Sequence, residues 1–215
     1  MRAIIFDLDG TLFDDNQYIQ AGFQRAATYL KLEYQIEALT DMIWEYAVNR
    51  HFDEVFQQVL DLHDLPAEEV DQLICEYHRN SAPLKPYADV NRLFEELDVK
   101  IPVGVVTGGK HGRQKLARLG LADRIDAIYV TPEEQETKYD EGPFIDILTD
   151  LDAAPERSIF VGDNPEMDFR WPNKLGMTTV WVRRWETLFT PPTTGELRPD
   201  YVLPTLDLLP QIARL

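Results

Sequence analysis

Carboxylates follow two short apolar runs of this sequence. Asp7 and Asp9 come directly after an apolar run near the N-terminus, and Asp163 follows a second one, with Asp168 shortly after it. Short apolar, β-branched runs are typical of strands buried in a parallel sheet, whose carboxyl ends meet at one edge. Carboxylates gathered there would repel one another without a cation. Oxygen ligands without His or Cys favour Mg²⁺ over a transition metal.

A phosphate is the natural missing ligand of such a site. Mg²⁺ usually takes one or two carboxylates, several waters and a substrate phosphate oxygen. An aspartate beside the ion can attack phosphorus and form an aspartyl-phosphate, and Asp7 is the predicted nucleophile. Asp9 could give a proton to the leaving alcohol and then take one from the attacking water.

Donors for the phosphate oxygens follow the next apolar runs. Thr107 and the amides of Gly108 and Gly109 stand between a predicted strand and a predicted helix, where they would form a phosphate cradle. Lys138, in the loop after the following strand, would add a full positive charge. Taken singly, a threonine here is usually a helix cap and a lysine is usually a solvated surface residue. The order in which Thr107, Lys138 and the aspartates follow one another along the chain favours the functional interpretation.

Alternating strand and helix patterns predict the elements that position these residues. They indicate an α/β fold with a doubly wound, mostly parallel sheet. The expected strands are Ile4 to Phe6, Val103 to Val106, Ala127 to Val130, Ser158 to Val161, Thr178 to Val182 and Tyr201 to Leu203. The expected helices lie near Asp89 to Leu97, Arg113 to Leu119 and Phe144 to Leu151, before Gly176, and at the end of the chain. The stretch from Glu186 to Pro199 is expected to be a surface loop.

The segment between the first strand and the second has a different character. It shows long amphipathic patterns without strand-like runs, which predicts an all-helical insert. Pro83 and Pro86 mark the return linker, because neither can continue a helix. The predicted division is an α/β core of residues 1–13 and 86–215 with a helical domain of residues 14–85. Arg50 and His51 in the insert are either exposed helix-end residues or contacts to a substrate.

Composition limits the classes of partner. The chain has 38 acidic and 21 basic residues and a net charge of -17, which would repel nucleic acid and anionic membranes. No apolar stretch approaches the roughly 20 residues of a membrane span. The single cysteine, Cys75, allows no internal disulfide, so a cytoplasmic location is expected. The expected partner is a small phosphorylated metabolite, and both a monomer and a homodimer remain open.

The ordered set of motifs resembles the haloacid dehalogenase-like hydrolase superfamily over essentially the whole chain. The matching residues are Asp7-Leu8-Asp9-Gly10-Thr11, then Thr107, then Lys138, then Gly162-Asp163 with Asp168. The resemblance implies a Rossmann-like core and a magnesium cofactor. It also implies that the helical insert is a cap, similar to that of small-molecule phosphatases such as phosphoglycolate phosphatase and the nucleotidases.

The resemblance also implies a role for each matching residue. Asp7 would be the nucleophile, and Asp9 would be the general acid and base whose backbone carbonyl also binds Mg²⁺. Asp163 would be a metal ligand, and Asp168 would support the metal site directly or through water. Thr107, Gly108 and Lys138 would bind phosphate.

The sequence departs from the pattern at three places, one of which is Trp171, after Asp168, where a small residue is common. The third-motif lysine is usually followed by Pro-x-Pro, whereas this chain continues from Lys138 with Tyr139-Asp140-Glu141-Gly142-Pro143. Gly108 stands where the second motif often has Asn, which could change contacts near the substrate.

The predicted function is hydrolysis of a small phosphomonoester. A phosphomutase of the β-phosphoglucomutase kind shares the motifs and the cap, and remains an alternative. A non-catalytic binding or regulatory module is a third hypothesis, motivated by the altered third motif. Halide removal is less favoured, because the dehalogenases lack an acid/base aspartate at the Asp9 position.

Overall fold

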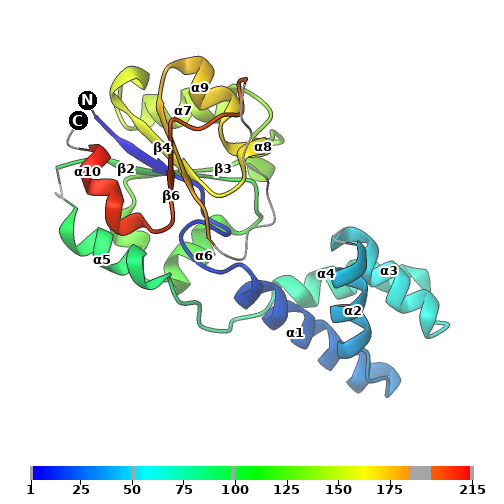
Figure 1. Cartoon of the computed structure of the whole chain (residues 1–215). Coiled ribbons are helices and arrows are strands. Elements are labelled where there is room, and N and C mark those ends of the chain that lie inside the picture. Colours follow the sequence, from blue (N-terminus) through cyan, green and yellow to red (C-terminus); the bar gives the residue numbers. More distant parts are fainter. Residues whose placement is uncertain (1, 50–51, 98–99, 185–194, 214–215) are drawn as a thin grey trace. The chain divides into compact units, whose positions relative to one another are not determined.

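The computed structural model describes residues 2–49, 52–97, 100–184 and 195–213. The chain divides into two compact units, one of residues 1–14 and 84–215 and one of residues 15–83 (Figure 1). Arg50, His51, Trp185 and residues 186–194 of the expected loop lie outside the described residues. Among the helices that are described, none combines the length and the apolar character needed to cross a membrane.

The larger unit is built on one six-stranded sheet in which every pair of neighbouring strands is parallel. In order across the sheet the strands are β3 (Ala127–Val130), β2 (Val103–Thr107), β1 (Ile4–Phe6), β4 (Ile159–Gly162), β5 (Thr178–Val182) and β6 (Tyr201–Leu203). Helices lie on both sides of this sheet (Figure 1). The predicted doubly wound parallel α/β fold is therefore confirmed.

The register of the central strands brings three chain segments together. Phe6 of β1 pairs with Val105 of β2 on one side and with Val161 of β4 on the other. The ladder continues one residue further, because the Asp7 amide donates to the Val161 carbonyl at 2.8 Å. The residues after β1, β2 and β4 consequently share one edge of the sheet.

Both faces of β1 are covered, which explains its uninterrupted apolar sequence. Ile5 belongs to a buried cluster on one face that includes Phe160, whose ring meets that of Phe144 edge to face at 5.3 Å. Phe6 points to the other face, where its ring centroid lies 5.9 Å from that of Phe94.

Helices and 3₁₀ turns connect the strands. The helices are α5 (Ala88–Glu96), α6 (Gly112–Arg118), α7 (Gly142–Asp150), α8 (Pro165–Asp168), α9 (Arg170–Leu175) and α10 (Leu209–Ala213). The 3₁₀ turns are η2 (Ala122–Arg124), η3 (Thr131–Glu134), η4 (Pro155–Arg157) and η5 (Leu206–Leu208). The helix expected before Gly176 is α9, and Gly176 ends it with a φ of 80°, a conformation that suits glycine.

A buried ion pair anchors the loop after β1. Arg184 donates to the Asp89 carboxylate at 2.6 Å and to the Thr11 carbonyl at 2.8 Å. Asp89 also accepts from the Leu206 amide at 2.8 Å, and the guanidinium lies 3.9 Å from the centre of the Tyr87 ring. The segments around Arg184 and Leu206 and helix α5 are thereby held together at Thr11, the last residue of the first motif.

The smaller unit is helical, as predicted. It contains α1 (Asn16–Tyr34), α2 (Leu39–Asn49), α3 (Phe52–Leu62), the 3₁₀ turn η1 (Ala67–Glu69) and α4 (Val70–His78). Its centre is aromatic, because Phe23, Phe56 and Tyr77 pack within 6.1 Å of one another. Gly22 of α1 allows this packing, since a Cβ there would lie 2.2 Å from the Tyr77 ring.

Candidate active site

Three aspartates converge at the carboxyl ends of β1 and β4. Asp7 follows β1, Asp163 follows β4, and Asp168 is the last residue of α8. One carboxylate oxygen of each lies within 4.8 Å of the others. Asp7 and Asp168 are buried, with exposed fractions of 4% and 0%. The structure therefore brings together three of the four predicted metal-site aspartates through their side chains.

Local backbone features place Asp168 in this cluster. Asn164 caps α8 by accepting from the Glu166 amide, and its own amide donates to Asp168 Oδ2 at 2.9 Å. Gly162 provides the space, because a Cβ there would lie 2.3 Å from Asp168 Oδ2. Gly162 of the fourth motif is thus required by the packing of the Asp168 carboxylate, six residues later.

The loop after β1 positions Asp163. Gly10 has a φ of 80°, and a Cβ on it would lie 2.5 Å from Asp163 Oδ2. The buried Thr11 hydroxyl donates to Asp163 Oδ1 at 3.3 Å, and the Trp181 indole N–H donates to the Asp163 carbonyl at 2.8 Å. Glycine at position 10 serves both the turn and the close approach of the carboxylate.

Lys138 lies inside the carboxylate cluster. Its ammonium group donates to Asp7 Oδ1, and to Asp168 Oδ1 at 2.8 Å. Burial alone would lower the pKa of Lys138, but the charges of Asp168 and Asp7 outweigh it and raise that pKa. Lys138 is therefore a permanently charged group at the centre of the site.

The environment of Asp7 disfavours its charged form when no metal is bound. The pKa of Asp7 is raised to about 7, because burial and the carboxylates of Asp168 and Asp9 raise it more than Lys138 lowers it. A second positive charge beside Asp7 would favour the carboxylate form that a nucleophile needs.

A different set of contacts surrounds the Asp9 carboxylate. Lys115 of α6 donates to Asp9 Oδ1 at 2.6 Å, and the Thr107 hydroxyl donates to Asp9 Oδ2 at 3.3 Å. The Gly109 amide donates to Thr107 Oγ1 at 3.1 Å, whereas Gly108 is exposed. The structure thus joins Thr107 directly to Asp9 and leaves Gly108 at the surface.

Lys115 is not among the site residues that the sequence predicts. A signal for it exists, since the buried face of α6 is formed by Gly112, Lys115 and Leu116, with Leu119 following the helix. A lysine on the apolar stripe of an amphipathic helix is unusual unless it has a partner. Periodicity alone does not reveal that the partner is Asp9.

Hydrogen bonds stabilise the loop after Lys138, where the sequence departs from Pro-x-Pro. Asp140 Oδ2 accepts from the Thr137 amide at 2.9 Å and from the Thr137 hydroxyl at 2.8 Å. The Trp171 indole N–H donates to the Tyr139 carbonyl at 2.6 Å, and the Lys174 ammonium lies 4.7 Å from the centre of a Trp171 ring. These contacts order the loop without the prolines.

The residues of the site fit a divalent cation. The carboxylates of Asp7, Asp163 and Asp168 supply hard oxygen ligands, and Gly10 leaves room for one of them. With Asp9, four acidic side chains stand against the ammonium groups of Lys115 and Lys138. Mg²⁺ would balance this excess of acidic groups.

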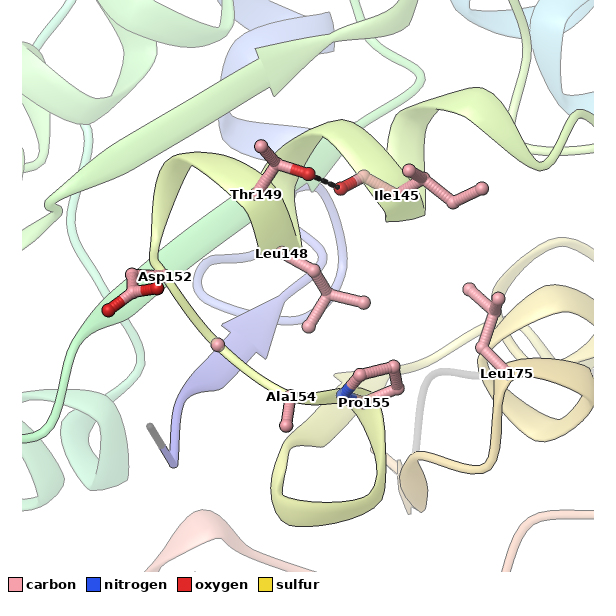
Figure 2. A pocket seen from close by; sticks show the side chains of 8 residues that line it. Ile145, Leu148, Thr149, Asp152, Ala154, Pro155 and Leu175 are labelled. Atoms are coloured by element: carbon pink, nitrogen blue, oxygen red, sulfur yellow. Dashed lines mark hydrogen bonds between the residues drawn. The ribbon is translucent and has the colours of Figure 1, made fainter.

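A pocket elsewhere in the larger unit has a different character. It is lined by Ile145, Leu148, Thr149, Asp152, Ala153, Ala154, Pro155 and Leu175. Figure 2 shows Leu148, Pro155 and Leu175 facing this pocket, which lies near the C-terminal end of α7. Its lining is mainly apolar and shares no residue with the carboxylate cluster.

Comparisons with known proteins agree with this geometry. The family model described as haloacid dehalogenase-like hydrolase matches residues 4–182. Glyceraldehyde 3-phosphate phosphatase of Methanopyrus kandleri is 28% identical over 236 residues, covering 100% of this chain and 99% of the relative. A putative pyrophosphatase PpaX of Clostridium perfringens is 28% identical over 226 residues, covering 100% of this chain and 99% of the relative.

Solved structures lead to the same family. The crystal structure of a HAD phosphatase from Thermococcus onnurineus superimposes with a TM-score of 0.68 at 26% identity, covering 99% of this chain and 97% of that one. The family model spans most of the chain, and the named relatives are phosphatases. The chain belongs to the haloacid dehalogenase-like hydrolase family and is an enzyme of its phosphatase subgroup.

Proposed function

We propose that the chain is a Mg²⁺-dependent phosphomonoesterase that hydrolyses a small phosphorylated metabolite through an aspartyl-phosphate on Asp7. The observation that carries the proposal is the position of Asp7. Its carboxylate is buried beside the Lys138 ammonium and within 4.8 Å of carboxylate oxygens of Asp163 and Asp168. A phosphate ester would offer an electrophilic phosphorus to this carboxylate, and the cations of the site would offset the repulsion between the two negative groups.

The reaction has two halves. In the first, an Asp7 carboxylate oxygen forms a bond to phosphorus, the ester P–O bond breaks, and the leaving oxygen takes a proton from Asp9. In the second, a water oxygen attacks the same phosphorus and its proton passes to Asp9. The bond between phosphorus and Asp7 then breaks, which releases inorganic phosphate and restores both side chains.

The remaining residues bind and orient. Mg²⁺, held by the Asp7 and Asp163 carboxylates and the Asp9 carbonyl, would neutralise charge on the transferred phosphoryl group. Asp168 would support the metal site and, by its 2.8 Å contact, keeps Lys138 directed toward Asp7. The Gly108 amide would bind a phosphate oxygen, and the Thr107 hydroxyl and Gly109 amide would do so by exchanging their present acceptors, Asp9 and Thr107, for the phosphate.

The substrate class is proposed from the relatives and from the chain's own architecture. The two named relatives act on glyceraldehyde 3-phosphate and on pyrophosphate, both small phosphorylated compounds. The helical unit, inserted directly after the first motif, would act as a cap that excludes water and restricts the site to small substrates.

A panel of phosphorylated metabolites, including glyceraldehyde 3-phosphate and pyrophosphate, tests the proposal by the release of inorganic phosphate with Mg²⁺. We expect Asp7→Asn to lower kcat by about 10⁴-fold or more, because the attacking oxygen is lost. Asp150→Asn, which changes an exposed aspartate of α7, is the matched control and should keep wild-type activity. Full Mg²⁺-dependent activity of Asp7→Asn would refute the mechanism.

The same panel separates the alternatives. A phosphomutase would interconvert sugar phosphate isomers with little release of phosphate. A binding or regulatory module would hydrolyse neither the metabolites nor a generic aryl phosphate when Mg²⁺ is present.

A further inference from the structure

We infer that Lys115 is a positioning residue for Asp9, holding its carboxylate in the orientation from which it protonates the leaving group. This inference rests on the proposed function, since it requires Asp9 to act as the general acid. It assigns a task to a residue outside the four motifs.

The Asp9 carboxylate is held at both oxygens. Lys115 Nζ binds Oδ1 at 2.6 Å, and the Thr107 hydroxyl binds Oδ2 at 3.3 Å. The two donors come from α6 and from the end of β2, so they restrain rotation of the carboxylate from two directions. The side chain of Asp9 nevertheless remains 23% exposed, which leaves it accessible to a ligand.

The position of Lys115 is costly without a charged partner. Its side chain is only 7% exposed, on the helix face that also buries Gly112 and Leu116. A leucine there would complete the apolar stripe, whereas an ammonium group loses much of its hydration. The ion pair with Asp9 offsets this cost and explains why a lysine occupies this buried position.

Gly109 makes room for the same ion pair. A Cβ at this position would lie 2.3 Å from Asp9 Oδ2 and 3.0 Å from Lys115 Nζ. The absence of a side chain at Gly109 and the buried lysine on α6 are separate features of the chain, and both serve the placement of one carboxylate.

The kinetic consequence depends on the leaving group. An alkyl alcohol leaves as a strongly basic oxygen and needs a proton from a correctly placed acid, which contributes about 10²–10⁴-fold to the rate. A p-nitrophenolate leaves without such help. Loss of the Lys115 contact should therefore slow the transfer of phosphoryl groups from alkyl esters much more than from aryl esters.

The experiment compares kcat/KM for glycerol phosphate and p-nitrophenyl phosphate in the intact chain with Mg²⁺. This constant reports the first half of the reaction, before the phosphoenzyme is hydrolysed. We expect Lys115→Met to lower the alkyl-to-aryl ratio of kcat/KM by about 10-fold or more. This is a part of the rate enhancement that a correctly placed general acid contributes. Lys110→Met, which removes an exposed positive charge from the turn before α6, is the control and should leave the ratio unchanged.

Asp9→Asn distinguishes failure of this inference from failure of the proposed function. If Asp9→Asn lowers the alkyl-to-aryl ratio and Lys115→Met does not, the positioning role of Lys115 is wrong, whereas the assignment of Asp9 as the general acid is supported. If Asp9→Asn leaves the ratio unchanged, Asp9 is not the acid and both proposals fall.

A merely structural role would lower both rate constants by the same factor and would also overturn the inference. Circular dichroism and thermal unfolding check that the variants fold. Should Lys115→Met not fold, Lys115→Gln removes the charge but keeps a donor of similar length, and the same lowered ratio is expected of it. Lys115→Arg, which retains the charge, should recover part of the ratio.

Discussion

The ammonium group of Lys138 forms a buried ion pair with the carboxylate of Asp7, although the two residues are 131 positions apart. The pair joins the loop after β3 to the end of β1. Each partner has at most 6% of its side chain exposed, so the interaction is little screened by water or salt.

This ion pair leads to the first prediction. Lys138→Met should lower kcat by about 10²–10³-fold, because one fixed positive charge at the transferred phosphoryl group and beside the nucleophile is lost. Lys31→Met, which changes a lysine of α1 that is 61% exposed, is the control. Steady-state kinetics with the best substrate of the panel measures both, and an unchanged kcat for Lys138→Met would contradict the assignment.

Metal binding should stabilise the folded chain independently of catalysis. A ligand at a hundredfold excess over its Kd adds about 2.7 kcal/mol to the free energy of unfolding. We therefore expect Mg²⁺ to raise Tm by several degrees and EDTA to reverse the shift. Asp163→Asn should reduce the shift, because one oxygen ligand loses its charge.

Thermal unfolding with and without Mg²⁺ measures this effect. Asp150→Asn again serves as the control and should retain the full shift. An equal Mg²⁺ shift in Asp163→Asn and in the unmodified chain would place the metal elsewhere.

The ion pair of Arg184 with Asp89 should contribute to stability in a pH-dependent way. Burial by itself raises the pKa of Asp89, but hydrogen bonds from Arg184 and the Leu206 amide outweigh it, so the pKa is lowered. A lowered folded-state pKa gives stability that is present above the ordinary pKa of about 3.9 and is lost as pH falls through the folded value. Removing one partner of a buried pair costs about 3–5 kcal/mol.

Urea unfolding at several pH values tests this prediction. Asp89→Asn should be much less stable than the unmodified chain at neutral pH, and the two should converge in strong acid. The surface pair of Arg92 with Asp207, which joins α5 to η5 at 2.8 Å, provides the control variant Asp207→Asn. A loss in Asp89→Asn no larger than in Asp207→Asn would show that burial adds nothing to this ion pair.

Gly22 should be essential for packing within the helical unit. Alanine normally stabilises a helix by up to about 1 kcal/mol relative to glycine. Here its Cβ would lie 2.2 Å from the Tyr77 ring, and such overpacking costs about 1–3 kcal/mol. We expect Gly22→Ala to be destabilising in denaturant unfolding, whereas Gln20→Ala, at an exposed position of the same helix, should not be. A more stable Gly22→Ala protein would mean that the ring can move aside.

Much of the larger unit could be predicted from the sequence because its signals are local. The run Ile4 to Phe6 is apolar at every position, and both of its faces are buried in the sheet. The sequence predicts Asp7 and Asp163 as site residues because ligands bind beyond the carboxyl ends of parallel strands, and each residue directly follows one. Lys138 was selected by its place in an ordered set of motifs, and the structure places it against two aspartates.

The contacts between distant segments were decided only by the tertiary structure. Lys115 and Asp9 are 106 positions apart, and nothing in the period of α6 identifies the partner of a buried lysine. Arg184 and Asp89, 95 positions apart, likewise meet only in the folded chain, where β5 is a strand of the sheet and α5 contacts β1 through Phe94 and Phe6.

The sequence by itself determined the strands, the helices and the residue types that could do the chemistry, because backbone periodicity and residue type are properties of neighbouring positions. It did not determine that β4 lies beside β1, which brings Asp163 and Asp168 to Asp7. Strand order depends on how whole segments bury their apolar faces together. That free energy belongs to the packed sheet and to no single stretch of the chain.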